Sequence, residues 1–243
     1  MSLLLIDNSN TRTKFTLAQH GELQPELRVL PTAEISPASL AHALEGWVYE
    51  QAILCSVVPR AAGILRSSLA CPVHEVTAAA CPELLSHYPG RATLGADRIA
   101  NAAAAAAHYP LPCVAVDLGT ACTFDTIARV DGAPRLIGGV IAPGLRALAA
   151  APASSTAQLP GISTHHLHTA PALGTDTRTA LQAGLYHGYT GMVSGILQSI
   201  ARQLGQQPFV VLTGGDATLW HPLPTWANAY DKCLTFKGMI SIF

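Results

Sequence analysis

The sequence is poor in charged residues. Only 12% of its 243 residues are charged, and 14 Lys and Arg against 15 Asp and Glu give a net charge of −1. That share is about half of what soluble domains usually carry. The basic residues are scattered and form no Lys or Arg run, so we expect no nucleic-acid partner. Because 49% of the residues are hydrophobic, the sequence predicts a sizeable core and further surface that is buried against a partner subunit.

Cysteine pairs and membrane-directed segments are also missing. The six cysteines form no Cys-x-x-Cys pair, and Cys55 and Cys113 stand in apolar runs. This predicts reduced, buried thiols and a cytoplasmic location. No basic lead precedes the first apolar run, which is too short for a signal peptide. The segment 179–201 has no formal charge, but glutamine, histidine and hydroxyl residues interrupt it, so we expect a soluble protein and no membrane span.

The stretch Cys113–Asp125 combines an apolar run with a polar turn. Val114–Val116 predicts a buried strand that ends at Asp117, and Gly119 follows as a turn. Glycine lets backbone N–H groups approach a ligand closely. A carboxylate beside such a turn repels phosphate unless a cation lies between them, so Asp117 indicates a metal–phosphate site. An ordinary Asp-Leu-Gly β-turn explains the same residues.

A similar pattern lies near the N-terminus. Leu3–Ile6 predicts a strand that ends at Asp7, and Phe15–Leu17 predicts a second strand before a turn at His20-Gly21. In the later stretch, Asp131-Gly132 takes the place of that turn. Two copies of strand, Asp, turn and strand at a half-chain interval predict a duplicated fold whose hairpins clasp one polyphosphate.

Strand and helix patterns alternate through the rest of the chain. Helices are expected over 38–49, 61–69, from 96 to before 110, and over 145–150, with strands over 52–58, 73–76, 136–141 and 209–212. Residues 81–91 and 151–172 are expected to be loops. This alternation predicts an α/β fold.

Asp97 and Arg98 are expected in the first turn of the alanine-rich helix that begins near Ala96. The partial positive charge of a helix N-terminus keeps Asp97 ionised and favours an anion beside Arg98. A plain helix cap explains the aspartate equally well. The all-alanine faces of this helix imply very close packing, which holds its first turn rigidly.

Three further patterns are open to more than one interpretation. A zinc site at His165, His166 and His168 is not favoured, because no other ligand types cluster nearby. Residues 174–177 predict a helix N-cap, and the helix after it carries two Gly-x-x-x-Gly spacings, 184/188 and 191/195, which permit close helix contact within the subunit or across a dimer. The Gly-Gly pair in residues 213–216 offers a flat surface for adenine, or is a plain turn.

In this order the motifs resemble those of type III pantothenate kinases, of the acetate and sugar kinase/heat-shock chaperone/actin superfamily. The resemblance covers nearly the whole chain. Its matched segments are Asp7–Lys14, Gly95–Arg98, Asp117–Asp125, Gly138–Gly144, Thr156–Pro160 and Thr213–Ala217. It implies an α/β fold of two duplicated ribonuclease H-like (actin-like) domains, at residues 1–112 and 113–243. Each would have a mixed sheet flanked by helices, with a cleft between the domains.

The resemblance also implies an activity, the ATP-dependent phosphorylation of pantothenate to 4′-phosphopantothenate, the first step toward coenzyme A. Asp97 would be the general base. The implied substrate-binding residues are Tyr88, Gly95, Ala96, Asp97, Arg98 and Thr177, with Arg98 facing the carboxylate of pantothenate. ATP would be bound by Asp7, Asn8, Ser9, Asn10, Thr11, Arg12, Thr13, Lys14 and Thr120. Asp117 would help to bind a monovalent cation, K⁺ or NH₄⁺; Mg²⁺ is the expected divalent cation, and a homodimer the expected assembly.

Two positions depart from the family pattern. Ser9 replaces a glycine of the first phosphate motif, so it either strains the turn or contributes a hydrogen bond, and we predict weaker ATP binding. Pro89-Gly90 changes the loop after Tyr88. Two alternative functions are a non-catalytic nucleotide-binding regulator of the same fold and a kinase of another small hydroxy-acid.

Overall fold

The structure is a computed structural model that describes all residues except 1, 156–158, 165–166, 168–169 and 221, and omits the side chains of 154 and 155. The expected Thr156–Pro160 motif and the three-histidine pattern therefore lie partly or wholly outside the described residues. The chain forms two compact units. Unit 1 comprises Met1–Tyr109, Ile127–Ile137 and Cys233–Phe243, and unit 2 comprises Pro110–Thr126 and Gly138–Lys232. The boundary expected after residue 112 stays a prediction.

Unit 1 is built on a five-stranded mixed sheet. Its strands are β1 (Ser2–Asn8), β2 (Arg12–Gln19), β3 (Glu22–Pro31), β4 (Gln51–Ser56) and β5 (Val73–Glu75), in the order β3-β2-β1-β4-β5. β1 pairs antiparallel with β2 and parallel with β4, which pairs parallel with β5. The expected turn between β2 and β3 is present, with positive φ angles at His20 and Gly21.

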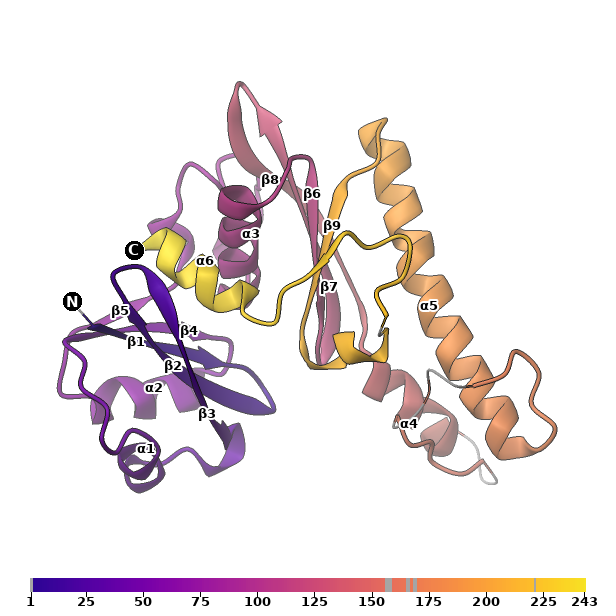
Figure 1. The fold of residues 1–243 in the computed structure, drawn as a ribbon, viewed down its shortest axis with the longest axis horizontal. Helices are drawn as coiled ribbons and strands as arrows, with labels where there is room; N and C mark the ends of the chain where they lie inside the picture. Colours follow the sequence, from indigo (N-terminus) through magenta and orange to yellow (C-terminus); the bar gives the residue numbers. More distant parts are fainter. Residues whose placement is uncertain (1, 156–158, 165–166, 168–169, 221) are drawn as a thin grey trace. The chain divides into compact units, whose positions relative to one another are not determined.

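Helices cover both faces of this sheet. α1 (Pro37–Ala43) and α2 (Pro59–Ser68) pack on one face, and α3 (Ala96–His108) and α6 (Leu234–Ile242) on the other (Figure 1). Consecutive residues of β1, Leu4 and Leu5, are therefore both fully buried, as expected for a central strand with two covered faces. A Cβ atom on Gly238 would overlap the backbone carbonyl of Ala100, so the close packing predicted for the alanine-rich helix is confirmed.

A second five-stranded sheet repeats this arrangement and belongs mostly to unit 2, except that Ile127–Ile137, where β7 turns into β8, is counted with unit 1. Its strands are β6 (Cys113–Leu118), β7 (Ala121–Val130), β8 (Ala133–Pro143), β9 (Phe209–Thr213) and β10 (Ala229–Tyr230), in the order β10-β9-β6-β7-β8. Taken from the other edge, this is the order of the first sheet with every strand number raised by five. Asp7 and Asp117 are each the next-to-last residue of the equivalent strands β1 and β6. The predicted α/β fold with a duplicated sheet is thereby confirmed.

In the described part of unit 2, the α-helices are α4 (Leu145–Ser155) and α5 (Thr177–Leu204). The expected N-cap is Asp176, whose Oδ1 accepts a hydrogen bond from the backbone N–H of Thr179 at 2.8 Å. α5 packs Tyr189, Val193 and Leu197 into the core beside β6 and β7. Although α5 has 28 residues, no helix in the described part of the chain is long and apolar enough to span a bilayer.

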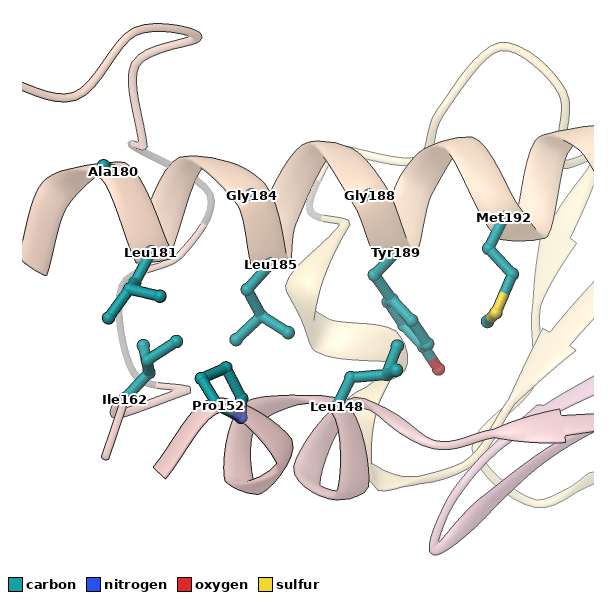
Figure 2. A pocket seen from close by; sticks show the side chains of 10 residues that line it. All are labelled: Leu148, Pro152, Ile162, Ala180, Leu181, Gly184, Leu185, Gly188, Tyr189 and Met192. Carbon is teal, nitrogen blue, oxygen red and sulfur yellow. The ribbon is translucent and has the colours of Figure 1, made fainter. Parts of the chain in front are cut away.

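An apolar pocket of about 440 Å³ lies between α4 and α5. Figure 2 shows Leu148 and Pro152 of α4 opposite Leu181 and Leu185 of α5. A Cβ atom at any of the four glycines 184, 188, 191 and 195 would meet no described heavy atom within 4 Å, its own helix backbone aside. Within the described residues of the subunit, the glycine spacings therefore bring no second helix into close contact.

Two predicted segments differ from the structure. The helix expected over 38–49 ends at Ala43, because a turn follows and Gly46 takes a φ of 78° outside the helical region. The loop expected from residue 151 begins later, because α4 continues through Pro152 to Ser155 from a run of strongly helix-forming alanines. None of the six cysteines takes part in a disulfide bond, and Cys55 and Cys113 are buried as predicted, together with Cys122; the reduced state stays a prediction.

Candidate active site

The first phosphate motif forms the turn between β1 and β2. Asp7 at the end of β1 is 4% exposed. Its Oδ2 accepts from Lys14 Nζ at 3.0 Å, and its Oδ1 accepts from Ser9 Oγ at 3.1 Å. Asp7 and Lys14 are paired residues of the antiparallel β1–β2 ladder, so the hairpin itself brings the carboxylate and the ammonium together. The buried negative charge of Asp7 is thus balanced by a half-buried Lys14.

The predicted ATP-binding residues of this loop fall into two groups, buried residues at its foot and exposed residues at its tip. Asn8 and Thr13 are buried and bonded to each other, with Asn8 Nδ2 donating to Thr13 Oγ1 at 2.7 Å. Asn10, Thr11 and Arg12 are exposed at the tip of the turn. The tip is closed by Ser9 N–H, which donates to the Arg12 carbonyl at 3.1 Å. The buried residues of the loop are thus fixed by polar contacts, and the residues at its tip are exposed.

Ser9 adopts the turn without a positive φ angle, so the backbone strain that was one interpretation of the sequence is absent at this residue. Among the described non-glycine residues, only His20 and Asp131 have a positive φ, so the expectation of strain at Ser9 is wrong. Its side chain turns back to Asp7 and contributes the hydrogen bond that was the other interpretation. The predicted effect of Ser9 on ATP affinity stays a prediction.

Asp97 lies in the first turn of α3, as predicted, where Gly95 is the N-cap residue and Ala96 the first helical residue. Burial raises the pKa of the Asp97 carboxyl above its ordinary value of 3.8. The backbone N–H of Arg98, which donates to Asp97 Oδ1 at 2.8 Å, opposes this rise. The negative charge of Asp7 adds to it, so the fold of unit 1 brings these two carboxylates within electrostatic range.

Local packing explains why glycine stands first in the Gly95–Arg98 motif. A Cβ atom on Gly95 would lie 2.6 Å from Asp97 Oδ1, so only glycine lets this carboxylate fold over the helix start. Ala96 is buried, and Arg98 is only 8% exposed. Tyr88 lies half-buried in the turn before α3, where its carbonyl accepts from Arg91 N–H at 3.1 Å. Substrate contacts of Tyr88 and Arg98 stay predictions.

The second phosphate motif has the same form in unit 2, and glycines surround it. Asp117 is half-buried, and Gly119 N–H donates to the Ala121 carbonyl at 3.1 Å, which closes the turn at the exposed Thr120. A Cβ atom on Gly214 would lie 2.5 Å from Asp117 Oδ1. A Cβ atom on Gly144 would overlap the carbonyls of Gly119 and Thr120. The Gly-Gly and Pro-Gly elements of the sequence therefore pack directly against this loop.

The segment after Gly214 is anchored by aromatic side chains. The 3₁₀ helix η5 (Gly215–Leu219) leads into Trp220, which stacks on Tyr189 with ring centroids 5.6 Å apart. Trp220 Nε1 donates to Thr190 Oγ1 at 3.1 Å, which fixes the ring to α5. Thr177, the predicted substrate-binding threonine, is the exposed first residue of α5.

The structure adds two residues that no motif singled out, Thr32 and Ser56. Ser56 Oγ donates to Asn8 Oδ1 at 2.6 Å, and Thr32 Oγ1 donates to the Ser9 carbonyl at 2.6 Å. Neither has a signal in the sequence, because each lies in a strand end or connection of ordinary composition. In the described parts of the chain, no three His, Cys, Asp or Glu side chains are placed to share a metal ion.

Comparisons with known proteins agree with these motifs. The family model described as type III pantothenate kinase matches residues 3–199. A type III pantothenate kinase of Akkermansia muciniphila is 44% identical over 239 residues, 98% of this chain and 97% of that protein. A type III pantothenate kinase of Methylacidiphilum infernorum is 35% identical, over 98% of this chain and 86% of that protein.

A solved structure shares the fold at lower identity. It is described as a conserved putative Baf family transcriptional activator from Campylobacter jejuni, with a TM-score of 0.56 and 21% identity over 100% of this chain and 96% of that one. At this identity the likeness shows the fold alone. The family model and the two relatives carry the assignment: the chain belongs to the type III pantothenate kinase family.

Proposed function

We propose that this protein transfers the γ-phosphoryl group of ATP to the primary hydroxyl of pantothenate, giving 4′-phosphopantothenate and ADP. The observation that carries the proposal is the Asp97 carboxyl, which is half-buried at the start of α3 within electrostatic range of Asp7. A carboxylate so placed can accept the hydroxyl proton beside a phosphate loop. The new O–P bond forms as the bond to the ADP oxygen breaks, and the proton goes to Asp97.

The raised pKa of Asp97 suits this role. A base is most effective when its pKa approaches the working pH, and an aspartate with an ordinary pKa is a weak base. Burial and the nearby Asp7 shift the pKa of Asp97 in the useful direction. In phosphoryl transfer most of the catalysis is alignment and charge neutralisation. Asp97 therefore mainly orients the hydroxyl, and Arg98 is proposed to bind the carboxylate of the substrate.

Two loops are proposed to serve the phosphates of ATP. Residues Asp7–Lys14 would supply backbone N–H groups, hydroxyls and the Lys14 ammonium, and Thr120 would act from the second loop. That Asp7 and Asp117 serve the same nucleotide stays a prediction from the duplicated sequence pattern.

Asp117 is proposed to help bind a monovalent cation, K⁺ or NH₄⁺. A carboxylate oxygen is a suitable ligand for such a cation, and Gly214 leaves room beside Asp117 Oδ1, where a Cβ atom would lie 2.5 Å away. When bound, the cation would supply positive charge between this carboxylate and the phosphates, and Mg²⁺ would accompany ATP.

A coupled assay of ADP release tests the proposal. The expected result is ADP release that requires pantothenate, increases with K⁺ or NH₄⁺, and falls by roughly two to four orders of magnitude in Asp97→Ala, the range of general-base contributions. Pantothenate-independent or absent turnover would favour the nucleotide-binding regulator. Turnover with another hydroxy-acid alone would favour the second alternative.

We further propose a cytoplasmic homodimer in which α5 contributes to the subunit contact. The exposed Gly184, Gly188 and Gly191 lie along α5 with open space at each Cβ position, as far as the described residues extend, which leaves room for the close approach of another helix. Sedimentation of the wild type beside Gly188→Leu tests this contact. A dimer that survives the bulky leucine with unchanged affinity would exclude it.

A further inference from the structure

We propose that Thr32 is a positioning residue that orients the backbone of the first phosphate loop toward ATP. This inference rests on the proposed function and goes beyond its motifs, because Thr32 lies in the 3₁₀ helix η1 (Thr32–Glu34), after β3 and outside every segment of the family resemblance. Thr32 is 7% exposed. Its position under the loop is therefore fixed by packing as well as by hydrogen bonds.

Thr32 holds the loop at two points. Its hydroxyl Oγ1 donates to the carbonyl of Ser9 at 2.6 Å. Its backbone N–H donates to the carbonyl of Thr11 at 3.1 Å. These two carbonyls flank Asn10, the exposed residue at the tip of the turn. A single residue thus ties down the backbone on both sides of the tip.

The direction of the hydrogen bonds is set by chemistry. The Ser9 carbonyl can only accept, so the Thr32 hydroxyl is the donor. The bond of 3.0 Å between Thr13 Oγ1 and Thr32 Oγ1 must then be donated by Thr13. The Thr13 oxygen in turn accepts from Asn8 Nδ2 at 2.7 Å.

The chain of bonds continues into the scaffold. Asn8 Oδ1 accepts from Ser56 Oγ at 2.6 Å, and Ser56 Oγ accepts from Val58 N–H at 3.1 Å. Val58 is the N-cap residue of α2. Each hydroxyl in this chain therefore donates once, and all donors point the same way, from α2 toward the phosphate loop. Such aligned bonds polarise and strengthen one another in a buried setting.

The consequence concerns the N–H group at the tip. In a trans peptide the carbonyl and the following N–H point to opposite sides. Because Thr32 draws the Ser9 carbonyl inward, the N–H of Asn10 is turned to the exposed side of the loop. Backbone N–H groups presented in this way bind phosphate oxygens. Thr32 acts on ATP through the loop and does not contact the reacting atoms.

The test compares Thr32→Val with Thr16→Val. Thr16 is also buried in unit 1, and its hydroxyl donates to the carbonyls of Gln24 and Glu26 at 3.2 and 2.9 Å, away from the loop. Both variants lose a buried hydroxyl that bonds backbone carbonyls, so both lose comparable stability. Thr32→Ser retains the donor and serves as the rescue variant.

Three readouts separate positioning from stability. We expect Thr32→Val to raise the KM for ATP by about threefold to tenfold, the equivalent of one hydrogen bond, with the KM for pantothenate unchanged. Thr16→Val and Thr32→Ser should keep the parental KM for ATP. Calorimetric binding of ADP, and hydrogen exchange of the amides of residues 9–12, should show the same ranking without turnover.

Equal KM values for ATP in Thr32→Val and Thr16→Val, or no rescue by serine, would overturn the role of Thr32. A parent protein that releases no ADP with pantothenate would refute the proposed function instead. ADP binding and amide exchange would still decide the role of Thr32 in that case.

Discussion

The Gly214-Gly215 pair allows a sharp test of the second phosphate loop. Gly214 has φ 91° and ψ 162°, a region that is essentially restricted to glycine. A Cβ atom there would lie 2.5 Å from Asp117 Oδ1 and 2.5 Å from the Leu118 carbonyl. A Cβ atom on the next residue, Gly215, would meet nothing within 4 Å. Alanine should therefore destabilise the protein strongly at position 214 and hardly at all at position 215.

Two costs add at Gly214. The backbone conformation costs an L-residue about 1 to 3 kcal/mol. The overlap adds about 1 to 3 kcal/mol, as for an overpacked core, because the Leu118 carbonyl belongs to β6 and cannot rotate away as a side chain would. Gly214→Ala should thus lower the free energy of unfolding by roughly 2 to 6 kcal/mol. Gly215→Ala should change it by less than about 0.5 kcal/mol.

Urea unfolding monitored by circular dichroism measures the free energy of unfolding of both variants. The ADP-release assay measures the ATP and K⁺ concentrations that each variant needs for half-maximal rate. Below the unfolding transition, we expect Gly214→Ala to require more ATP and more K⁺ for half-maximal rate, because the new methyl group displaces the Asp117 carboxylate. Gly215→Ala should keep the parental values. Unfolding midpoints of the two variants that coincide would refute the close approach of Gly214 to Asp117 and Leu118.

Three further predictions concern the first loop and the base. For the parent, kcat/KM for pantothenate should fall as the pH drops through an apparent pKa above 3.8, because burial raises the pKa of Asp97 and its protonated form accepts no proton; an acid limb at or below 3.8 would contradict this. Lys14→Met should move that limb to still higher pH, because the unbalanced charge of Asp7 then favours protonated Asp97, and an unmoved limb would speak against this coupling. Against the weaker ATP binding predicted from the sequence, the structure leads us to expect that Ser9→Gly does not lower the KM for ATP, because the Ser9 hydroxyl bonds Asp7 and the backbone at Ser9 has no positive φ; a clearly lower KM would support the prediction from the sequence.

The sequence by itself determined the fold class and the position of the motifs. Asp7 and Asp117 each follow a short apolar run and precede a polar turn, and this local pattern is enough to predict a strand end and a hairpin. The start of α3 at Ala96 follows from the intrinsic helix propensity of alanine. Such features depend on residues close in the chain, so they can be inferred without a tertiary structure.

The tertiary structure decided which groups support the motifs. Thr32 is 23 residues from Ser9 in the sequence, and Ser56 is 48 residues from Asn8. No local sequence pattern therefore predicts their hydrogen bonds to the loop. The inward turn of the Ser9 side chain likewise depends on Asp7 and Lys14 meeting across the β1–β2 ladder. The shift in the pKa of Asp97 arises from burial and from Asp7, which is distant in sequence. Hydrogen bonding and desolvation depend on distances in space, and only the folded chain sets those distances.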